Sequence, residues 1–279
     1  MSPEPTEVKA PRWFARHLLW LEHGSARLYL GSGSRQATTW TELAAVTLPA
    51  GTGPSTETLR EVLAHRVGRW WRSLEVVLGA GLSSIFTVDL GEVELPQEVA
   101  LAAIAHRHAE LWGQGAPACQ LLFDETVRQG WVPVFVCPGG LPEQIGQAAR
   151  AAGMSLRSVQ VAACWAVAHR ARALRGDGPN DALTGWTVYE APDRLVGVLE
   201  RAGVLRGVVD LPPREEVAAL RRRLHVWERR LGIVDAVPGP LVLLHAPSSV
   251  WRIEPGEEAI VSGLLPEPTA RQPLAEVAA

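Results

Sequence analysis

Lysine is almost missing from this chain of 279 residues, in which Lys9 is the only one among 27 lysines and arginines. Lys9 lies in a Pro- and Glu-rich segment at the N-terminus, so arginine supplies every cation of the remaining sequence. A phosphate-loop lysine, a Schiff-base lysine and a kinase-type strand lysine each need an ammonium group at a fixed place in the fold. The sequence therefore excludes these three chemistries.

Cysteine, long apolar runs and surplus basic charge are also scarce. Cys119, Cys137 and Cys164 lie in apolar segments without paired spacing, which favours reduced thiols over disulfides or a metal site. No apolar run approaches the roughly 20 residues of a membrane helix, and the N-terminus lacks the apolar centre of a secretory signal. With a net charge of -3, we expect a cytoplasmic protein with no direct membrane span and no nucleic-acid partner.

The composition that remains is that of a globular α/β protein. Hydrophobic residues make up 47% of the chain and charged residues 20%, enough apolar surface for one large core or two moderate ones. We expect flexible tails at residues 1–12 and 266–279, because both are rich in Pro, Glu and Ala without apolar periodicity. A Gly/Pro-rich break at 113–118 separates two expected lobes, 13–115 and 116–265.

Hydrophobic periodicity predicts a similar run of elements in each lobe: hairpin-forming strands followed by helices and further strands. In the first lobe the strands are expected at 18–30 (a hairpin), 37–49, 74–79 and 83–90, and the helices at 57–71 and 95–112. In the second lobe we expect strands at 119–125, 131–137 and 239–247, a three-strand meander at 184–212, and helices at 141–153 and 214–232. Residues 156–174 fit either one long helix or a strand that enters a helix.

This order of elements resembles the actin-like ATPase superfamily, and more narrowly the PilM-type and GspL-type scaffolds of type IV pilus and type II secretion machines. The resemblance spans about residues 16–250. Its phrases are LWLEHGSARLYL, LEVVLGAGLSSIFTVDLGEVELPQEVALAAI, VPVFVCPGGLPEQIGQAARAAGMSLRSVQVAACWAVAHRA and TGWTVYEAPDRLVGVLERAGVLRGVVDLP. It implies an α/β fold of two ribonuclease H-like lobes, each a mixed sheet with flanking helices.

The resemblance also implies a place for nucleotide in the first hairpin. In nucleotide-binding members a hairpin holds phosphate through glycine amides, and an aspartate places Mg²⁺. Here Glu22 stands near the place of that aspartate, and Gly24 and Ser25 keep the turn small. These three residues are interpreted as the remnant of a phosphate hairpin, with the alternative that Glu22 is a strand-end carboxylate facing water.

Two further nucleotide contacts of the family look degraded. Where the second hairpin would read Asp-x-Gly-x-x-Thr, this chain has Glu190 and then Pro192, which has no amide to donate. Where a glycine turn would cover adenosine, residues 241–250 contain no glycine. We therefore expect a pseudo-ATPase rather than an enzyme. We also expect no bound cofactor, with ATP and Mg²⁺ as the alternative.

Tryptophan is abundant, with eleven residues against two tyrosines and four phenylalanines. Trp70 and Trp71 are expected to end a helix, and Trp227 lies with Arg223 and Arg230 in the Arg-rich helix LRRRLHVWERRLG. Protein interfaces concentrate tryptophan and arginine, so these five residues are the candidate partner-binding surface. The alternative is that the tryptophans cap the cores and the arginines form a solvated face.

Two catalytic functions are kept as alternatives, and both would use Glu22. A weak ATPase would keep Glu22 and Gly24 and use Arg27 in place of lysine. A two-metal nuclease would need Glu22, Asp89, Asp124 and Asp210 to converge, which the ribonuclease H-like sheet allows but the lack of basic charge disfavours. The histidines lack metal-ligand spacing, and we expect neither a metal site nor a catalytic residue.

The leading hypothesis from sequence is a non-enzymatic scaffold of the PilM/GspL kind. Such a protein would dock the cytosolic N-terminal segment of a bitopic inner-membrane assembly protein, and in addition the motor ATPase of the machine. It would be cytoplasmic and peripheral to the inner membrane through that partner. Pilus and secretion system, separate subunit and cytoplasmic fragment all stay open.

Overall fold

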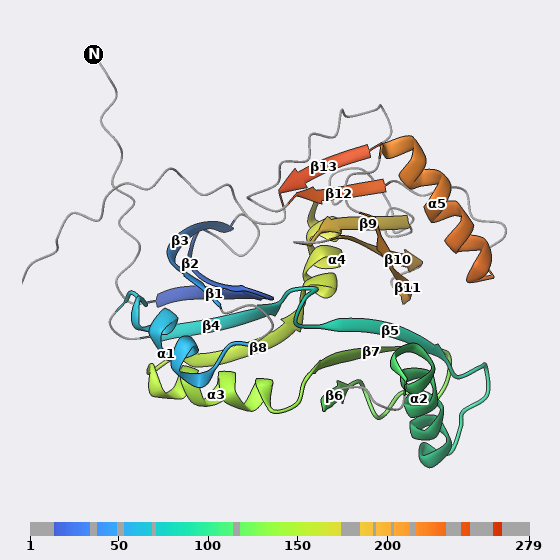
Figure 1. Cartoon of the computed structure of the whole chain (residues 1–279), viewed down its shortest axis with the longest axis horizontal. Coiled ribbons are helices and arrows are strands. Elements are labelled where there is room, and N and C mark those ends of the chain that lie inside the picture. Colours follow the sequence, from blue (N-terminus) through green and yellow to red (C-terminus); the bar gives the residue numbers. More distant parts are fainter. Residues whose placement is uncertain are drawn as a thin grey trace, which may run out of the picture. The chain divides into compact units, whose positions relative to one another are not determined.

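The computed structural model describes a mixed α/β protein whose contacts divide it into two units (Figure 1). Unit 1 contains the chain up to Val77 together with Pro142–Val159, and unit 2 contains Leu78–Leu141 and Gln160–Glu267. The residues that the structure describes are 14–33, 38–48, 53–68, 71–113, 118–173, 185–191, 194–201, 204–212, 216–232, 241–245 and 259–263.

Unit 1 is built on a five-stranded sheet with the order β3-β2-β1-β4-β8. The first three strands form an antiparallel meander, and β8 comes from far along the chain to pair beside β4. The strands are β1 (Phe14–Glu22), β2 (Ser25–Gly33), β3 (Thr38–Thr47), β4 (Trp71–Leu78) and β8 (Ser155–Val161), and the helices are α1 (Thr56–Ala64) and α3 (Leu141–Ala151).

Helix α1 starts where the sequence predicted but ends earlier. The Ser55 side chain caps its N-terminus by accepting a hydrogen bond from the Thr58 amide at 3.1 Å. Leu59, Val62 and Leu63 form its buried stripe. The expectation that Trp70 and Trp71 end this helix is wrong for Trp71, which begins β4, because the helical apolar spacing stops before the glycine at 68. Trp70 lies outside the described residues.

Unit 2 carries a second five-stranded sheet, with the order β11-β10-β9-β12-β13. The predicted meander is confirmed, since β9, β10 and β11 pair antiparallel, whereas β12 pairs parallel with β9 and with β13. The strands are β9 (Gly185–Glu190), β10 (Leu195–Arg201), β11 (Val204–Leu211), β12 (Leu241–His245) and β13 (Ala259–Gly263), and the helices are α4 (Ala162–Ala173) and α5 (Val217–Arg230). Strand β13 was not predicted.

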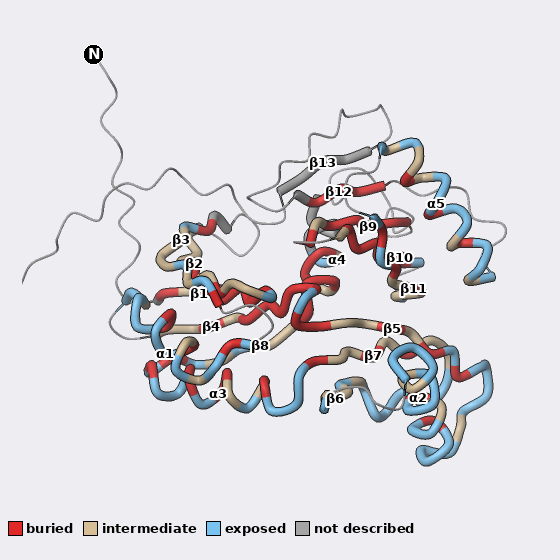
Figure 2. The backbone as a smooth tube through the Cα atoms, in the orientation of Figure 1, coloured by how far each residue is buried: buried red, intermediate tan, exposed pale blue. Residues whose placement is uncertain are grey.

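The core of this second sheet is covered by α5, whose Leu220 and Leu224 are at most 2% exposed. They pack with Val188, Leu199 and Leu243 from the strands, which are at most 3% exposed. The tube of β9 is mostly red, the colour of buried residues, in Figure 2. Strands β9 and β10 are buried along nearly their whole length, as continuous apolar runs in a covered sheet should be.

Unit 2 also contains a smaller sheet with the order β5-β7-β6, whose strands pair antiparallel. Its elements are β5 (Ser84–Asp89), α2 (Gln97–Trp112), β6 (Cys119–Leu122) and β7 (Trp131–Pro138). Phe86, Ile104, Val132 and Val134 belong to its core, where α2 contributes Ile104.

The ambiguous segment 156–174 is a strand that enters a helix, because β8 ends at Val161 and α4 begins at Ala162. Strand β8 belongs to the first sheet although it follows the small sheet in sequence. Each unit therefore combines separate stretches of chain, which differs from the expected continuous lobes 13–115 and 116–265. That expectation assumed that sheets form from neighbouring segments, whereas a late strand such as β8 carries no local signal of its partner.

Candidate functional site

The first hairpin keeps the tight turn that the sequence predicted. Glu22 pairs with Ser25, so only His23 and Gly24 connect β1 and β2. Gly24 has φ +95°, a conformation that disfavours residues with a Cβ atom, and its carbonyl accepts a hydrogen bond from the Leu48 amide at 2.8 Å. The structure thus brings Glu22, Gly24 and Ser25 together in one compact turn.

The Glu22 carboxylate is held within this unit rather than presented to water. Glu22 is 9% exposed, and its Oε1 accepts a hydrogen bond from Trp20 Nε1 at 3.0 Å. Trp20 and Glu22 lie two residues apart on one strand and so share a face of the sheet. The interpretation of Glu22 as a solvated strand-end carboxylate is therefore wrong, because the neighbouring indole binds it.

Arg27, the residue considered as a substitute for a phosphate-binding lysine, has a partner on the next strand. Its Nη1 lies 3.6 Å from Glu42 Oε2, and both side chains are partly exposed. The pair lies across β2 and β3, beyond the turn itself. This guanidinium is therefore already engaged by a carboxylate of its own sheet.

The second predicted hairpin connects β9 and β10. Glu190 pairs with Leu195, and the Ala191 amide donates to the Arg194 carbonyl at 2.9 Å, which closes the turn. Pro192 lies outside the described residues, as does the expected adenosine turn beyond His245. The proposed loss of these two nucleotide contacts stays a prediction from sequence.

A cavity of about 460 Å³ lies within unit 2, between the small sheet with α2 and the larger sheet with α5. Among the described residues, its walls are rich in aromatic side chains: Phe86, Trp112, Trp186, Tyr189 and Trp227. The Thr87 hydroxyl donates to the Arg206 carbonyl at 3.2 Å and so ties β5 to β11 near the cavity. Concave, aromatic-lined spaces with a few polar groups are the usual form of a binding site.

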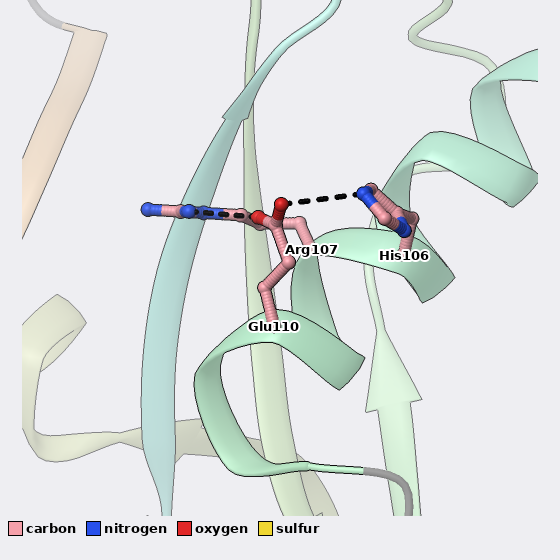
Figure 3. Close-up of polar contacts among 3 residues, drawn as sticks. All are labelled: His106, Arg107 and Glu110. Atoms are coloured by element: carbon pink, nitrogen blue, oxygen red, sulfur yellow. Dashed lines mark hydrogen bonds and ion pairs between the residues drawn. The ribbon is translucent and has the colours of Figure 1, made fainter.

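Arg107 contributes a charged group to the cavity wall, and Glu110 holds it in place. Arg107 Nη1 lies 2.9 Å from Glu110 Oε2, while His106 Nε2 lies 3.2 Å from Glu110 Oε1 (Figure 3). The hydrogen bond from Arg107 is the main reason that the pKa of Glu110 is lowered from its ordinary value. Glu110 therefore stays ionised and orients both basic neighbours.

Arg194 is the second arginine of the cavity wall. Its Nη2 donates to the Ala80 carbonyl at 2.8 Å, and its Nε lies 3.5 Å from Asp210 Oδ1. Arg194, Ala80 and Asp210 all line the cavity. Arginines fixed by carboxylates are typical of recognition surfaces, because little side-chain entropy is lost when a ligand arrives.

The fold brings together only some of the predicted partner-binding residues, namely those on α5. Trp227 is half-buried and lines the cavity, and Arg230 stacks over its ring at 5.1 Å from the centroid. Arg223 is exposed one turn earlier on α5, so the three share one side of this helix. For Trp71 only the backbone, in β4, is described.

Sequence analysis missed Arg107, Arg194 and Asp210 as parts of one site, because they come from a helix, a turn and a strand far apart in the chain. Four tryptophans that were not among the candidates belong to the cores, as the alternative interpretation of tryptophan expects. Trp20, Trp40, Trp165 and Trp186 are at most 6% exposed. At the end of α2, the structure leaves the apolar Leu111 and Trp112 45% and 41% exposed, and both line the cavity.

The carboxylates considered for a nuclease each serve local structure. Asp89 accepts the Gly91 amide at 3.0 Å, and Asp124 accepts the Thr126 amide and hydroxyl, which lowers the pKa of Asp124. Asp210 lies beside the Arg194 guanidinium. Within the part of the chain that the structure describes, no three His, Cys, Asp or Glu residues gather as a metal site would require, and no helix has the length and hydropathy of a membrane span.

Comparison with known proteins gives similarity at the level of structure only. No protein-family model and no curated protein sequence matches the chain. A Bacteroides thetaiotaomicron protein of unknown function with an actin-like ATPase fold is 10% identical, with a TM-score of 0.50 over 89% of this chain and 87% of that one. The cytoplasmic domain of EpsL, an inner-membrane component of the Vibrio cholerae type II secretion system, is 12% identical, with a TM-score of 0.45 over 89% of each chain.

The PilM–PilN type IV pilus biogenesis complex is also similar, at 16% identity, with a TM-score of 0.47 over 84% of this chain and 82% of that one. Identities this low bear on the fold and not on the activity. Together with the two sheets of like strand order, the likeness to the Bacteroides protein confirms the predicted fold class. The chain has the actin-like ATPase fold.

Proposed function

We propose that this protein is a cytoplasmic scaffold with a degenerate nucleotide site, which docks the cytosolic segment of a bitopic inner-membrane protein in a type IV pilus or type II secretion machine. The PilM/GspL-type phrases of the sequence and the actin-like fold support this class of function. The motor ATPase is a second proposed partner on the same grounds.

The observation that carries the nucleotide part of the proposal is the hydrogen bond between Trp20 and Glu22. A carboxylate that places Mg²⁺ must be open to the ligand. Glu22 is instead nearly buried and accepts the Trp20 indole N–H at 3.0 Å. Arg27, with its guanidinium 3.6 Å from the Glu42 carboxylate, is likewise not set aside for phosphate.

The cavity of unit 2 is the proposed docking place. Its aromatic walls suit an apolar anchor side chain of the partner segment, and the arginines held by Glu110 and Asp210 suit the polar groups beside that anchor. Trp227 is the wall residue that the sequence also selected. No group transfer is needed for this role.

Binding can be measured by calorimetry between the full chain and a peptide of the N-terminal cytosolic segment of a candidate bitopic partner. We expect saturable binding that Trp227→Ala weakens at least about tenfold, since buried tryptophans dominate interfaces. Val226→Ala is the matched control, because Val226 is the preceding residue of α5, is 49% exposed and is not among the wall residues. Equal loss in both variants, or no binding to the parent chain, would contradict the docking proposal.

The nucleotide part is tested separately by thermal unfolding with millimolar ATP and Mg²⁺. A ligand that binds only the native state raises the melting temperature, so a degenerate site predicts no change. A rise of several degrees that Glu22→Ala abolishes would instead support the weak ATPase.

A further inference from the structure

The three free thiols of this protein lie in different surroundings. Cys137 is 3% exposed and so is sheltered from reagents in water. Cys164 is partly exposed, but burial raises its pKa to about 11, which disfavours the reactive thiolate. Cys119 is only half-buried and begins β6, which forms one edge of the three-stranded sheet. Cys119 therefore combines partial exposure with a position at the edge of a sheet.

An imidazole stands directly beside this thiol. Cys119 Sγ lies 3.4 Å from His108 Nε2, within hydrogen-bond distance for sulfur. When the ring proton is on Nδ1, Nε2 accepts the thiol proton. The contact joins the last turns of α2 to the start of β6.

Aromatic neighbours fix the position of the His108 ring. The centroid of Trp112 lies 5.0 Å from that of His108 with the planes 30° apart, and the centroid of Phe86 lies 6.2 Å away at 43°. Phe86 and Trp112 also contact each other edge to face, with centroids 5.4 Å apart. A nucleophile, a base in reach of it and further groups that orient the base are the parts of an activated cysteine.

We propose that Cys119 and His108 form a nucleophilic thiol site that is modified by soft, uncharged electrophiles. His108 Nε2 takes the proton from Sγ as the sulfur electron pair attacks the electrophilic atom. The sulfur pair becomes the new bond to sulfur, and the leaving group departs with the electron pair of the bond that breaks. With iodoacetamide as the probe, a sulfur–carbon bond replaces the carbon–iodine bond and iodide leaves, so no oxidant or reductant is required.

The test is timed alkylation of the folded full chain with iodoacetamide at pH 7, followed by mass spectrometry of the three cysteine peptides. We expect Cys119 to react at least about tenfold faster than Cys137 and Cys164. His108→Phe keeps an aromatic ring against Trp112 and Phe86 but removes the proton acceptor. We expect it to slow Cys119 at least about fivefold, the low end for loss of a positioned base.

His106→Gln is the matched control, because His106 lies two residues earlier on the same helix and contacts Glu110 instead of Cys119 (Figure 3). It should leave the rate at Cys119 unchanged. Continued protection of the buried Cys137 shows that a variant is still folded, and His108→Gln replaces His108→Phe if that protection is lost. Equal rates for all three thiols, or an unchanged rate at Cys119 in the His108 variants, would overturn the proposal.

Discussion

The two five-stranded sheets have the same strand order but are stabilised in different ways. In each sheet, three consecutive strands form an antiparallel meander, and two later strands extend the sheet beside the first strand of that meander. The orders are β3-β2-β1-β4-β8 in unit 1 and β11-β10-β9-β12-β13 in unit 2. Because the two sheets share a topology, the differences in their side-chain contacts show how each part of the sequence stabilises the same strand arrangement.

One difference concerns how each unit uses a buried tryptophan and a glutamate. In unit 1, Trp20 donates to Glu22 at 3.0 Å, two residues along the same strand. In unit 2, Trp186 donates to Glu228 at 2.8 Å, and the two residues are 42 positions apart, on β9 and α5. Unit 1 therefore stabilises its hairpin locally, whereas unit 2 attaches a helix to its sheet.

The largest expected effect comes from replacing a buried leucine in the helix that packs on each sheet, which distinguishes the unfolding of the two units. Leu220→Ala in α5 should lower the free energy of unfolding by about 2–5 kcal/mol, and Leu63→Ala in α1 by a similar amount, because both side chains are 0% exposed. Urea unfolding followed by circular dichroism measures the loss. If the units unfold separately, each variant shifts a different transition; Val226→Ala, at an exposed site of α5, should shift neither.

The response to acid should come from unit 1, where His17 is 0% exposed. Burial lowers the pKa of His17 from 6.5 to about 4, and its Nε2 accepts the Val67 amide at 3.3 Å. Below pH 6.5 the unfolded chain binds a proton at His17, whereas the native state binds it only near pH 4. The free energy of unfolding therefore falls as the pH falls from 6.5 to 4. We expect a loss of about 2 kcal/mol between pH 7 and pH 5.

Urea unfolding at both pH values measures this loss in the parent chain. His17→Gln keeps a polar acceptor but cannot titrate, so the difference between the two pH values should shrink by the same amount. His65→Gln, at an exposed site of unit 1, serves as the control. A parent chain with equal stability at pH 7 and pH 5 contradicts the assignment.

The two sheets also use glycine for different reasons, and alanine substitutions should reveal them. Gly24 has φ +95°, and no described atom lies within 4 Å of the place that a Cβ would take, so Gly24→Ala strains only the backbone, by about 1–2 kcal/mol. A Cβ at Gly197 in β10 would lie 3.0 Å from Val209 Cγ1 and 3.2 Å from Leu211 Cδ1, so the problem there is space.

Denaturation of double variants distinguishes strain from crowding. Val209→Ala should reduce the cost of Gly197→Ala, because it removes the atom in closest contact. The same Val209→Ala should leave the cost of Gly24→Ala unchanged. Equal coupling to both glycines would show that the distinction is wrong.

The smallest expected effect concerns the two Trp–Glu hydrogen bonds. Glu228→Gln keeps an acceptor for Trp186 but loses the charge, so the free energy of unfolding should fall by roughly 1 kcal/mol. Glu22→Gln should cost less, because a contact between residues two positions apart can persist in the unfolded chain. Chemical denaturation of the two single variants tests the order, and a larger cost for Glu22→Gln would reverse the comparison.

Much of the fold could be predicted from sequence because the signals were local. The cap at Ser55, the apolar stripe Leu59–Leu63 and the meander of β9, β10 and β11 follow from residues within one element or one hairpin. The early end of α1 was missed although the apolar spacing stops before Gly68. The existence of β13 was missed because it depends on pairing with β12 rather than on propensity.

The candidate sites divide in the same way. The turn of Glu22, Gly24 and Ser25 was visible in the sequence, but the burial of Glu22 was not, because a strand-end carboxylate looks alike whether or not an indole faces it. Trp227 was selected from composition alone, without the cavity that it lines. The pairing of Cys119 with His108 was not foreseen, since eleven residues separate them.

By itself, the sequence determined the class of chain: α/β, arginine-based, without a fixed lysine for phosphate chemistry, and built twice from hairpins and helices. Only the tertiary structure decided which strands share a sheet, which carboxylates are engaged, and which aromatic side chains form a cavity. Secondary structure and turns depend on residues a few positions apart, whereas burial and side-chain contacts depend on residues that the folded chain brings together from a distance.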